Sequence, residues 1–185
     1  MNQPTDYTLG QIADLLRSGT AFGGMPREEA MRIAQTMVMR HCEVGEVVFG
    51  EGQPNDGQLI LVVSGEARIT RRFTGETNNL IYRRAVPGHI MGEVGFIDGE
   101  VHSATCTALT EMHVAMLLRE QLAELMRVTP RAASQLMAGL LRLLAQRIRH
   151  ANNSLVELGQ AKLALEQENQ QLRADAGTRP QPLSP

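Results

Sequence analysis

One short stretch of the sequence combines several glycines, an acid among them and small polar residues, a set suited to binding a phosphorylated sugar. Four glycines stand at positions 88, 92, 95 and 99, with Glu93 among them. Glycine lets the backbone approach a ligand closely, and a short helical turn here would direct free N–H groups at an anion. A carboxylate cannot hold a phosphate, but it can accept a hydrogen bond from a sugar hydroxyl. The stretch therefore predicts a site for phosphate and ribose, with a turn-rich link between two strands as the alternative.

The same stretch belongs to an ordered series of motifs. A glycine-containing apolar segment covers 44–49 and is followed by Gly52, and a second apolar segment over 59–63 leads into Ser64-Gly65-Glu66. Gly-Glu-Val-Gly at 92–95 and His-Ser-Ala at 102–104 come next. In this order the sequence resembles the cyclic nucleotide-binding domain family, which includes catabolite-activator-type regulators, protein kinase A regulatory subunits and cyclic nucleotide-gated channels. The resemblance covers about residues 20 to 155.

The resemblance implies a phosphate-binding cassette that would bind cAMP or cGMP. In this family the cassette reads Gly-Glu, an apolar residue, a small residue and, after a short loop, Arg-Ser/Thr-Ala. The matching residues are Gly92, Glu93, Val94, Gly95, His102, Ser103 and Ala104. The backbone amides would hold the phosphate, and Glu93 would accept from the ribose 2′-hydroxyl. His102 stands where the family has arginine and offers fewer donors, so weak binding and no binding both stay open.

Local patterns predict the elements that would position these residues. Helices are expected over 9–18 and 26–40, the second beginning near Pro26. Glycine-punctuated strands, with a hairpin turn over 73–79, are expected over 44–49, 58–64, 66–73, 79–86, 103–108 and 111–118. The predicted fold is α+β: a β jelly roll, or double-stranded β-helix, with flanking N-terminal helices and a long C-terminal dimerisation helix.

The long helix is expected to begin at Thr129-Pro130, an N-cap and a first-turn proline, and to run to about Ala174. A three-four spacing of apolar residues holds through five heptads and favours a parallel two-stranded coiled coil. The seam positions are Leu141, Leu144, Ile148, Ala151, Leu155, Leu158, Lys162, Leu165, Asn169 and Leu172. Glu168 of one copy would reach Arg173 of the other. The alternative is a single helix packed on its own domain.

The resemblance also implies that the nucleotide base would face this helix. Counting along the helix places Ala151, Asn152 or Asn153 there, to within about one turn. An asparagine amide can both donate to and accept from a purine edge. The alternative is a solvated pair beside the seam. The domains expected are an N-terminal helical segment (1–19), a cyclic nucleotide-binding-like β-roll (20–130), the long helix and coiled coil (131–174) and a disordered tail (175–185).

Composition limits the partners. The 185 residues carry a net charge of −2, without the basic field typical of nucleic-acid binders. Cys42 and Cys106 fit neither a disulfide framework nor a zinc spacing, which favours a reducing cytoplasm. No apolar run is long enough for a membrane span, and residues 1–10 do not resemble a signal peptide. We expect a cytoplasmic protein that does not enter a membrane.

Direct binding to DNA is not expected. In the transcription factors of the family a helix-turn-helix follows the dimer helix, and this sequence has no such segment after the seam. Four basic residues on the helix could be mistaken for a DNA-binding region, but they are interleaved with apolar ones and indicate a solvated face. They are Arg142, Arg147, Arg149 and His150.

A metal-dependent enzyme built on the same jelly-roll scaffold is a further interpretation. Its candidate ligands would be His41, Glu43, Glu46, His89 and His113. No His-x-His pair occurs among them, and their spacing does not match a facial 2-His-carboxylate site. The sequence therefore predicts no catalytic residues, no metal and no cofactor.

These inferences combine into one functional prediction. The chain is expected to be a non-enzymatic, homodimeric cyclic nucleotide-binding module for signal transduction, without its own DNA-binding domain. Its downstream partner would be a protein that the sequence does not identify. The alternative is a degenerate domain that binds no nucleotide and serves as a dimeric protein-interaction scaffold.

Overall fold

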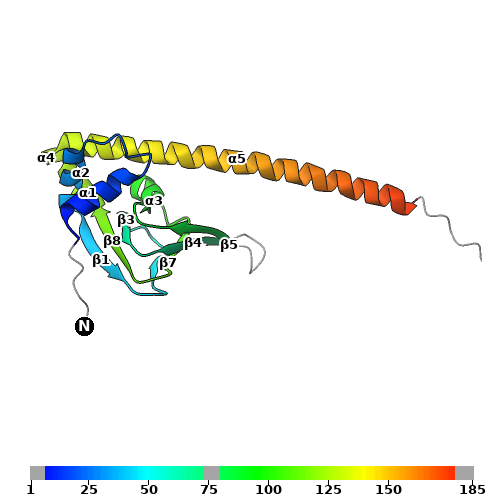
Figure 1. Cartoon of the computed structure of the whole chain (residues 1–185), viewed down its shortest axis with the longest axis horizontal. Helices are drawn as coiled ribbons and strands as arrows, with labels where there is room; N and C mark the ends of the chain where they lie inside the picture. The colour runs from blue at the N-terminus through cyan, green and yellow to red at the C-terminus, as the bar shows by residue number, and fades with distance from the viewer. Residues whose placement is uncertain (1–6, 73–79, 178–185) are drawn as a thin grey trace, which may run out of the picture. The chain divides into compact units, whose positions relative to one another are not determined.

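The computed structural model describes residues 7–72 and 80–177 (Figure 1). The chain divides into two compact units, and the boundary between them lies between Arg142 and Leu143. The elements, in chain order, are α1 (Leu9–Ser18), α2 (Arg27–Thr36), β1 (Val38–Cys42), β2 (Val47–Phe49), β3 (Gln58–Ser64), β4 (Ala67–Arg72), β5 (Leu80–Ala85), β6 (Ile90–Met91), α3 (Glu93–Asp98), β7 (Thr105–Ala108), β8 (Met112–Leu118), α4 (Arg119–Val128) and α5 (Pro130–Gly177).

Eight strands of the first unit form two antiparallel sheets. One has the strand order β1-β8-β3-β6, and the other has the order β2-β7-β4-β5. Several of the paired strands are far apart in the sequence, as in β1 with β8 and β2 with β7, whereas β4 and β5 are consecutive. Together with the N-terminal helices and the long C-terminal helix, this arrangement confirms the predicted α+β jelly-roll fold (Figure 1).

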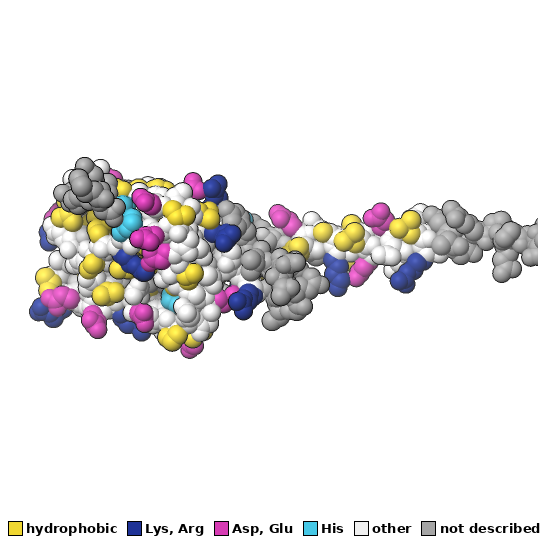
Figure 2. Space-filling model, turned by 90° about the horizontal axis from the view of Figure 1, so that it is seen from below, with side chains coloured by type: hydrophobic (Ala, Val, Ile, Leu, Met, Phe, Trp, Pro, Cys, Tyr) yellow, Lys and Arg dark blue, Asp and Glu magenta, His cyan; other side chains and the backbone are white. Residues whose placement is uncertain are grey.

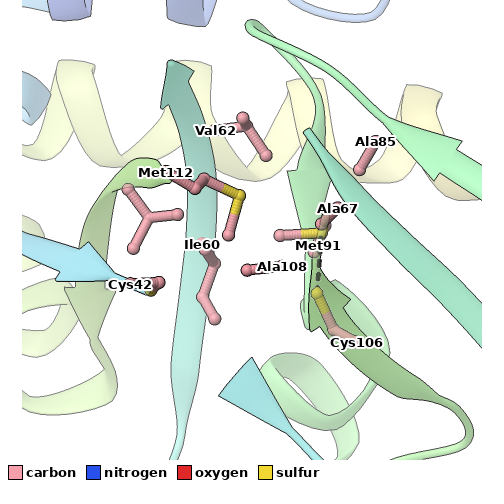
Figure 3. Close-up of a cluster of buried hydrophobic side chains, with 10 residues drawn as sticks. Cys42, Ile60, Val62, Ala67, Ala85, Met91, Cys106, Ala108 and Met112 are labelled. Carbon is pink, nitrogen blue, oxygen red and sulfur yellow. Dashed lines mark hydrogen bonds between the residues drawn. The ribbon is translucent and has the colours of Figure 1, made fainter. Parts of the chain in front are cut away.

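The core lies between the two sheets and pairs small residues with large ones (Figure 3). Ala67 and Ala85 contribute from β4 and β5, whereas Ile60 and Met91 come from the opposite sheet. The thiol of Cys106 donates to the sulfur of Met91 over 3.7 Å. This contact ties β7 of one sheet to β6 of the other, one residue before the predicted cassette.

The first turns of α5 complete the first unit by packing on its N-terminal region. Leu136 and Leu140 are fully buried. Gly139 permits a close approach, because a Cβ added there would lie 2.2 Å from the ring of Phe22. The guanidinium of Arg142 then donates from Nε to the carbonyl of Ala21 over 2.9 Å.

The second unit contains the remainder of α5, up to Gly177. Its predicted seam residues lie on one continuous helix, and Figure 2 shows yellow hydrophobic side chains along its surface. Five large apolar seam residues of this unit are each more than 60% exposed in the single chain: Ile148, Leu155, Leu158, Leu165 and Leu172. Leu144 is half-buried, while Ala151, Lys162 and Asn169 are exposed. Leu141, the first seam residue, belongs to the first unit and is also exposed.

The structure corrects several predicted boundaries. The helix predicted over 26–40 is wrong at its end, because α2 stops at Thr36 and the chain continues as β1, paired with β8. The strands predicted over 44–49 and 103–108 are shorter, and β6 and α4 were not predicted. Thr129 directly precedes α5, as predicted, and its carbonyl accepts from the amide of Ala133. Its hydroxyl donates to the carbonyl of Leu125 at the end of α4. Residues 175–177 of the predicted tail are helical, whereas 178–185 and the hairpin turn at 73–79 lie outside the described residues.

Candidate functional site

Strand β6 delivers the chain directly into the predicted cassette. Gly92 has a left-handed backbone (φ 75°) and forms the N-cap of α3. A Cβ at this position would lie 2.7 Å from the carbonyl oxygen of Gln58, so both the backbone angle and the close approach call for glycine. The amide of Phe96 donates to the carbonyl of Gly92 over 2.9 Å, which closes the first helical turn. The short helical turn predicted from the sequence is therefore present.

Glu93 occupies the first position of α3 and is buried, with 2% of its surface exposed. Among the described residues it is the one charged or polar residue that is buried. Removing a carboxylate from water is costly unless polar groups surround it, so the fold holds this acid in a defined interior position. Val94, which follows it, faces outward and is 41% exposed.

The far end of α3 is held by two residues that the sequence did not single out. The side chain of Asn55 lies against Gly95, where a Cβ would come within 2.0 Å of its Nδ2. Arg119 donates from Nη2 to the carbonyls of Gly95 (3.0 Å) and Phe96 (3.1 Å). The backbone amide of Arg119 donates to the carbonyl of Gly57. The first residue of α4 thus links α3 to the start of β3, a contact that no local sequence signal reveals.

The ring of His102 lies against strand β2, a neighbour that the sequence did not indicate. Its ring stacks on Phe49 of β2, with a centroid separation of 4.5 Å and an interplanar angle of 16°. Its backbone amide donates to the carbonyl of Gln53, and its carbonyl accepts from the amide of Gly52. Burial lowers the pKa of His102, and the nearby carboxylate of Asp56 opposes this effect only in part. The ring is therefore mostly neutral at pH 7.

The segment after His102 completes the second half of the cassette. Ser103 is exposed and Ala104 is half-buried just before β7 begins at Thr105. The loop between β2 and β3 contacts both halves, because Asn55 lies against Gly95 while residues 52 and 53 pair with His102. The two cassette motifs, which are separate in the sequence, are thus gathered around one loop.

Asn152 and Asn153, the predicted base contacts, are exposed residues of α5 in the second unit. Their contact with a base therefore stays a prediction.

The histidines considered for a metal site form a different arrangement. His41 and His113 face each other across β1 and β8, with ring centroids 4.9 Å apart. His113 also contacts the ring of Tyr7, and its Nδ1 lies 3.2 Å from the hydroxyl of Ser64. Within 7–72 and 80–177, no three histidine, cysteine or acidic residues come together as a metal site. Over the same residues, no helix is both long and apolar enough to cross a membrane.

Comparison with known proteins identifies the domain that holds this site. The sequence model of the cyclic nucleotide-binding domain family matches residues 39–128. The CRP-like cAMP-activated global transcriptional regulator of Mycobacterium tuberculosis H37Rv is 32% identical over 114 residues. That match covers 62% of this chain and 48% of the mycobacterial protein. The chain therefore spans about half the length of this relative.

Two solved structures share the fold over most of the chain. A cyclic nucleotide-binding domain from Methylobacillus flagellatus superposes with a TM-score of 0.70 and is 25% identical, covering 80% of this chain and 82% of its own. The catabolite activator protein of Thermus thermophilus has a TM-score of 0.64 and is 29% identical, covering 76% and 63% respectively. The family match and these structures agree with the cassette geometry: residues 39–128, just under half of the chain, match the cyclic nucleotide-binding domain family and share its fold.

Proposed function

We propose that this chain is a non-enzymatic regulatory module that binds a 3′,5′-cyclic nucleotide, cAMP or cGMP, in its cassette. The observation that carries the proposal is Glu93, a buried carboxylate held one residue after a left-handed glycine in a cyclic nucleotide-binding domain. In this position the acid accepts a hydrogen bond from the ribose 2′-hydroxyl. The amides of residues 92–95 and 103–104 hold the cyclic phosphate.

The module acts as a parallel homodimer through α5. Support comes from the exposed apolar seam, since large side chains that repeat along one helix are rarely left in water over such a length. Each leucine of the seam contributes about 1.5–3 kcal/mol when it is fully buried. Ligand binding is passed on to a protein partner and not to DNA. Because both cysteines are free and buried, we place the protein in the reducing cytoplasm.

Calorimetry with cAMP, cGMP and their 2′-deoxy analogues tests the ligand assignment. Glu93→Gln keeps the shape of the side chain but weakens the acceptor, so affinity for the ribose forms falls by roughly 10- to 100-fold. The loss is smaller for the 2′-deoxy forms, which lack the hydroxyl. Glu100→Gln, an exposed acid in the same segment, is the matched control and leaves affinity unchanged. Equal losses for ribose and deoxyribose ligands would remove Glu93 from this role.

A second function is favoured by one observation, the stacking of His102 on Phe49. In that case the domain binds no nucleotide and acts as a dimeric scaffold for a protein partner. His102→Arg restores the donor fork of the family and separates the two functions. Tighter binding of cAMP by this variant supports the nucleotide-binding module. If neither the wild type nor the variant binds a nucleotide, the scaffold function is correct.

A further inference from the structure

Strands β4 and β5 concentrate positive charge that the composition of the whole chain conceals. Together they carry five arginines and no acidic residue, although the chain as a whole has a net charge of −2. The remainder of the chain is therefore acidic overall. All five arginines are exposed: Arg68, Arg71, Arg72, Arg83 and Arg84. The two neighbouring strands thus form a basic patch on an otherwise acidic protein (Figure 1).

The register of these strands places three of the arginines on one face of the sheet. Opposed residues of an antiparallel pair lie on the same face, and residues two apart on a strand share it. Ala67 and Ala85, which are opposed, are buried in the core. The next opposed pair, Arg68 and Arg84, therefore lies on the outer face, and Arg72 follows on the same side of β4. We call these three residues the arginine face.

The charge of the arginine face is only partly neutralised. Arg68 and Arg84 are like charges placed directly opposite each other, an arrangement that destabilises a sheet. Glu66 forms an ion pair with Arg84. The guanidinium groups of Arg68 and Arg72 make no ion pair or hydrogen bond with any residue in 7–72 or 80–177. Two cations on this face are therefore available to an anionic partner.

The spacing of these two cations matches an extended chain. Thr70 lies between Arg68 and Arg72 on the same face and is opposite Thr105 of β7. Residues four apart on a strand are roughly 13–14 Å apart, and an extended peptide has the same repeat. A segment that lies along β4 with acids at alternate positions would therefore meet one guanidinium, then the hydroxyl of Thr70, and then the second guanidinium.

Carboxylates suit this face better than the backbone of a nucleic acid does. The pairing of Arg84 with Glu66 is an example within the domain itself, and the planar guanidinium fits a carboxylate through two parallel hydrogen bonds. A nucleic acid would extend beyond the patch and meet the acidic remainder of the chain, which repels it. A short acidic segment of a protein contacts the arginine face alone.

We propose that the arginine face of β4 and β5 is the docking surface for an extended acidic segment of a partner protein, with glutamate or aspartate at alternate positions. This inference rests on the proposed function, in which ligand binding is passed on to a protein partner. The arginine face lies on the side of its sheet opposite the core. Docking therefore uses a surface separate from the cassette.

The test titrates full-length protein into a fluorescein-labelled synthetic peptide in which glutamate alternates with threonine, and follows its anisotropy at low ionic strength. A second peptide of the same composition carries its glutamates in one block. The double variant Arg68→Gln/Arg72→Gln removes two cations of the arginine face. Its matched control, Arg127→Gln/Arg131→Gln, removes two exposed arginines of α4 and α5. An oligothymidylate of equal charge and vesicles that contain phosphatidylserine represent the other classes of polyanion.

We expect the alternating peptide to bind more tightly than the block peptide, the oligothymidylate or the vesicles. Arg68→Gln/Arg72→Gln should weaken its binding roughly 5- to 30-fold, as the loss of two exposed ion pairs implies, whereas the control should stay within about two-fold of the wild type. Higher ionic strength should remove most of this difference, because exposed charges are screened. The proposal is overturned by equal losses in the two double variants, by equal binding of the two peptides, by tighter binding of the oligothymidylate or the vesicles, or by no binding of the alternating peptide.

Calorimetric titrations of the same proteins with cAMP and cGMP separate this proposal from the proposed function. If the nucleotides bind but the alternating peptide does not, the docking surface is wrong and the nucleotide-binding module stands. If the peptide binds through Arg68 and Arg72 but no nucleotide binds, the docking surface stands and nucleotide binding fails. Thermal melts of all variants exclude unfolding as the cause of lost binding.

Discussion

Removing the guanidinium of Arg119 should loosen the cassette without touching its ligand-facing residues. One nitrogen of this side chain donates to the carbonyls of Gly95 and Phe96, at 3.0 and 3.1 Å. Hydrogen bonds from a charged donor contribute about 1.5–3 kcal/mol each when shielded. Because Arg119 is exposed and one nitrogen is shared between two acceptors, solvent screening reduces the expected total to about 1–2 kcal/mol.

Thermal unfolding of Arg119→Ala measures this loss. For a unit of this size, about 1 kcal/mol corresponds to a shift of about 4 °C, so we expect the melting temperature to fall by about 4–8 °C. Arg127→Ala is the matched control on the same helix, since Arg127 pairs with Glu124 on the surface, and its melting temperature should not change. Arg119→Lys should recover part of the loss. If Arg119→Ala melts at the wild-type temperature, the two bonds are no stronger than bonds to water and the reasoning is refuted.

Three further predictions concern the packing of Gly139, the seam of α5 and the half-buried His102. Gly139→Ala should destabilise the first unit by about 1–3 kcal/mol in denaturant unfolding, because the added methyl group meets the ring of Phe22. Gly159→Ala, whose methyl group meets open space, should instead raise helix content and stability by up to about 1 kcal/mol. Similar effects of the two changes would contradict the packing. Truncation after Ala151 removes most of the seam, and light scattering should then show a lower dimer fraction than full-length protein at the same concentration. Burial lowers the pKa of His102 in the folded state, so the stability that the neutral ring contributes is complete above the ordinary pKa of about 6.5 and is lost as the pH falls toward the lowered pKa. The melting temperature of the wild type should therefore fall more between pH 8 and pH 5.5 than that of His102→Phe. Equal falls would contradict the lowered pKa.

The sequence was sufficient to predict those elements that are specified by residues close together in the chain. Glycines that require a left-handed backbone, such as Gly65 and Gly92, mark turns that any pairing must respect. The start of β1 was missed because Met37 and Val38 extend the apolar stripe of the preceding helix. In the structure the hydroxyl of Thr36 donates to the carbonyl of Ile33 at the helix end, and Val38 pairs with Met116 of β8. A partner almost eighty residues away decides between helix and strand there, and no local pattern contains that information.

In the site, too, features set by neighbouring residues could be predicted and features set by distant residues could not. Glu93 could be selected from the sequence because an acid between glycines is unusual within an apolar segment. The stacking of His102 on Phe49 could not, because the residues come together only when β2 pairs with β7.

The buried thiols of the core provide this protein with an internal reporter of its own opening. Burial raises the pKa of Cys106 to about 12 and also raises the pKa of Cys42. At pH 7 the reactive thiolate of Cys106 is therefore rare, and the side chains of both cysteines are fully buried. Alkylation must therefore wait until the two sheets separate. The labelling rate in native buffer measures how often the β-roll opens, and its slowing by an added nucleotide would report binding without any engineered probe.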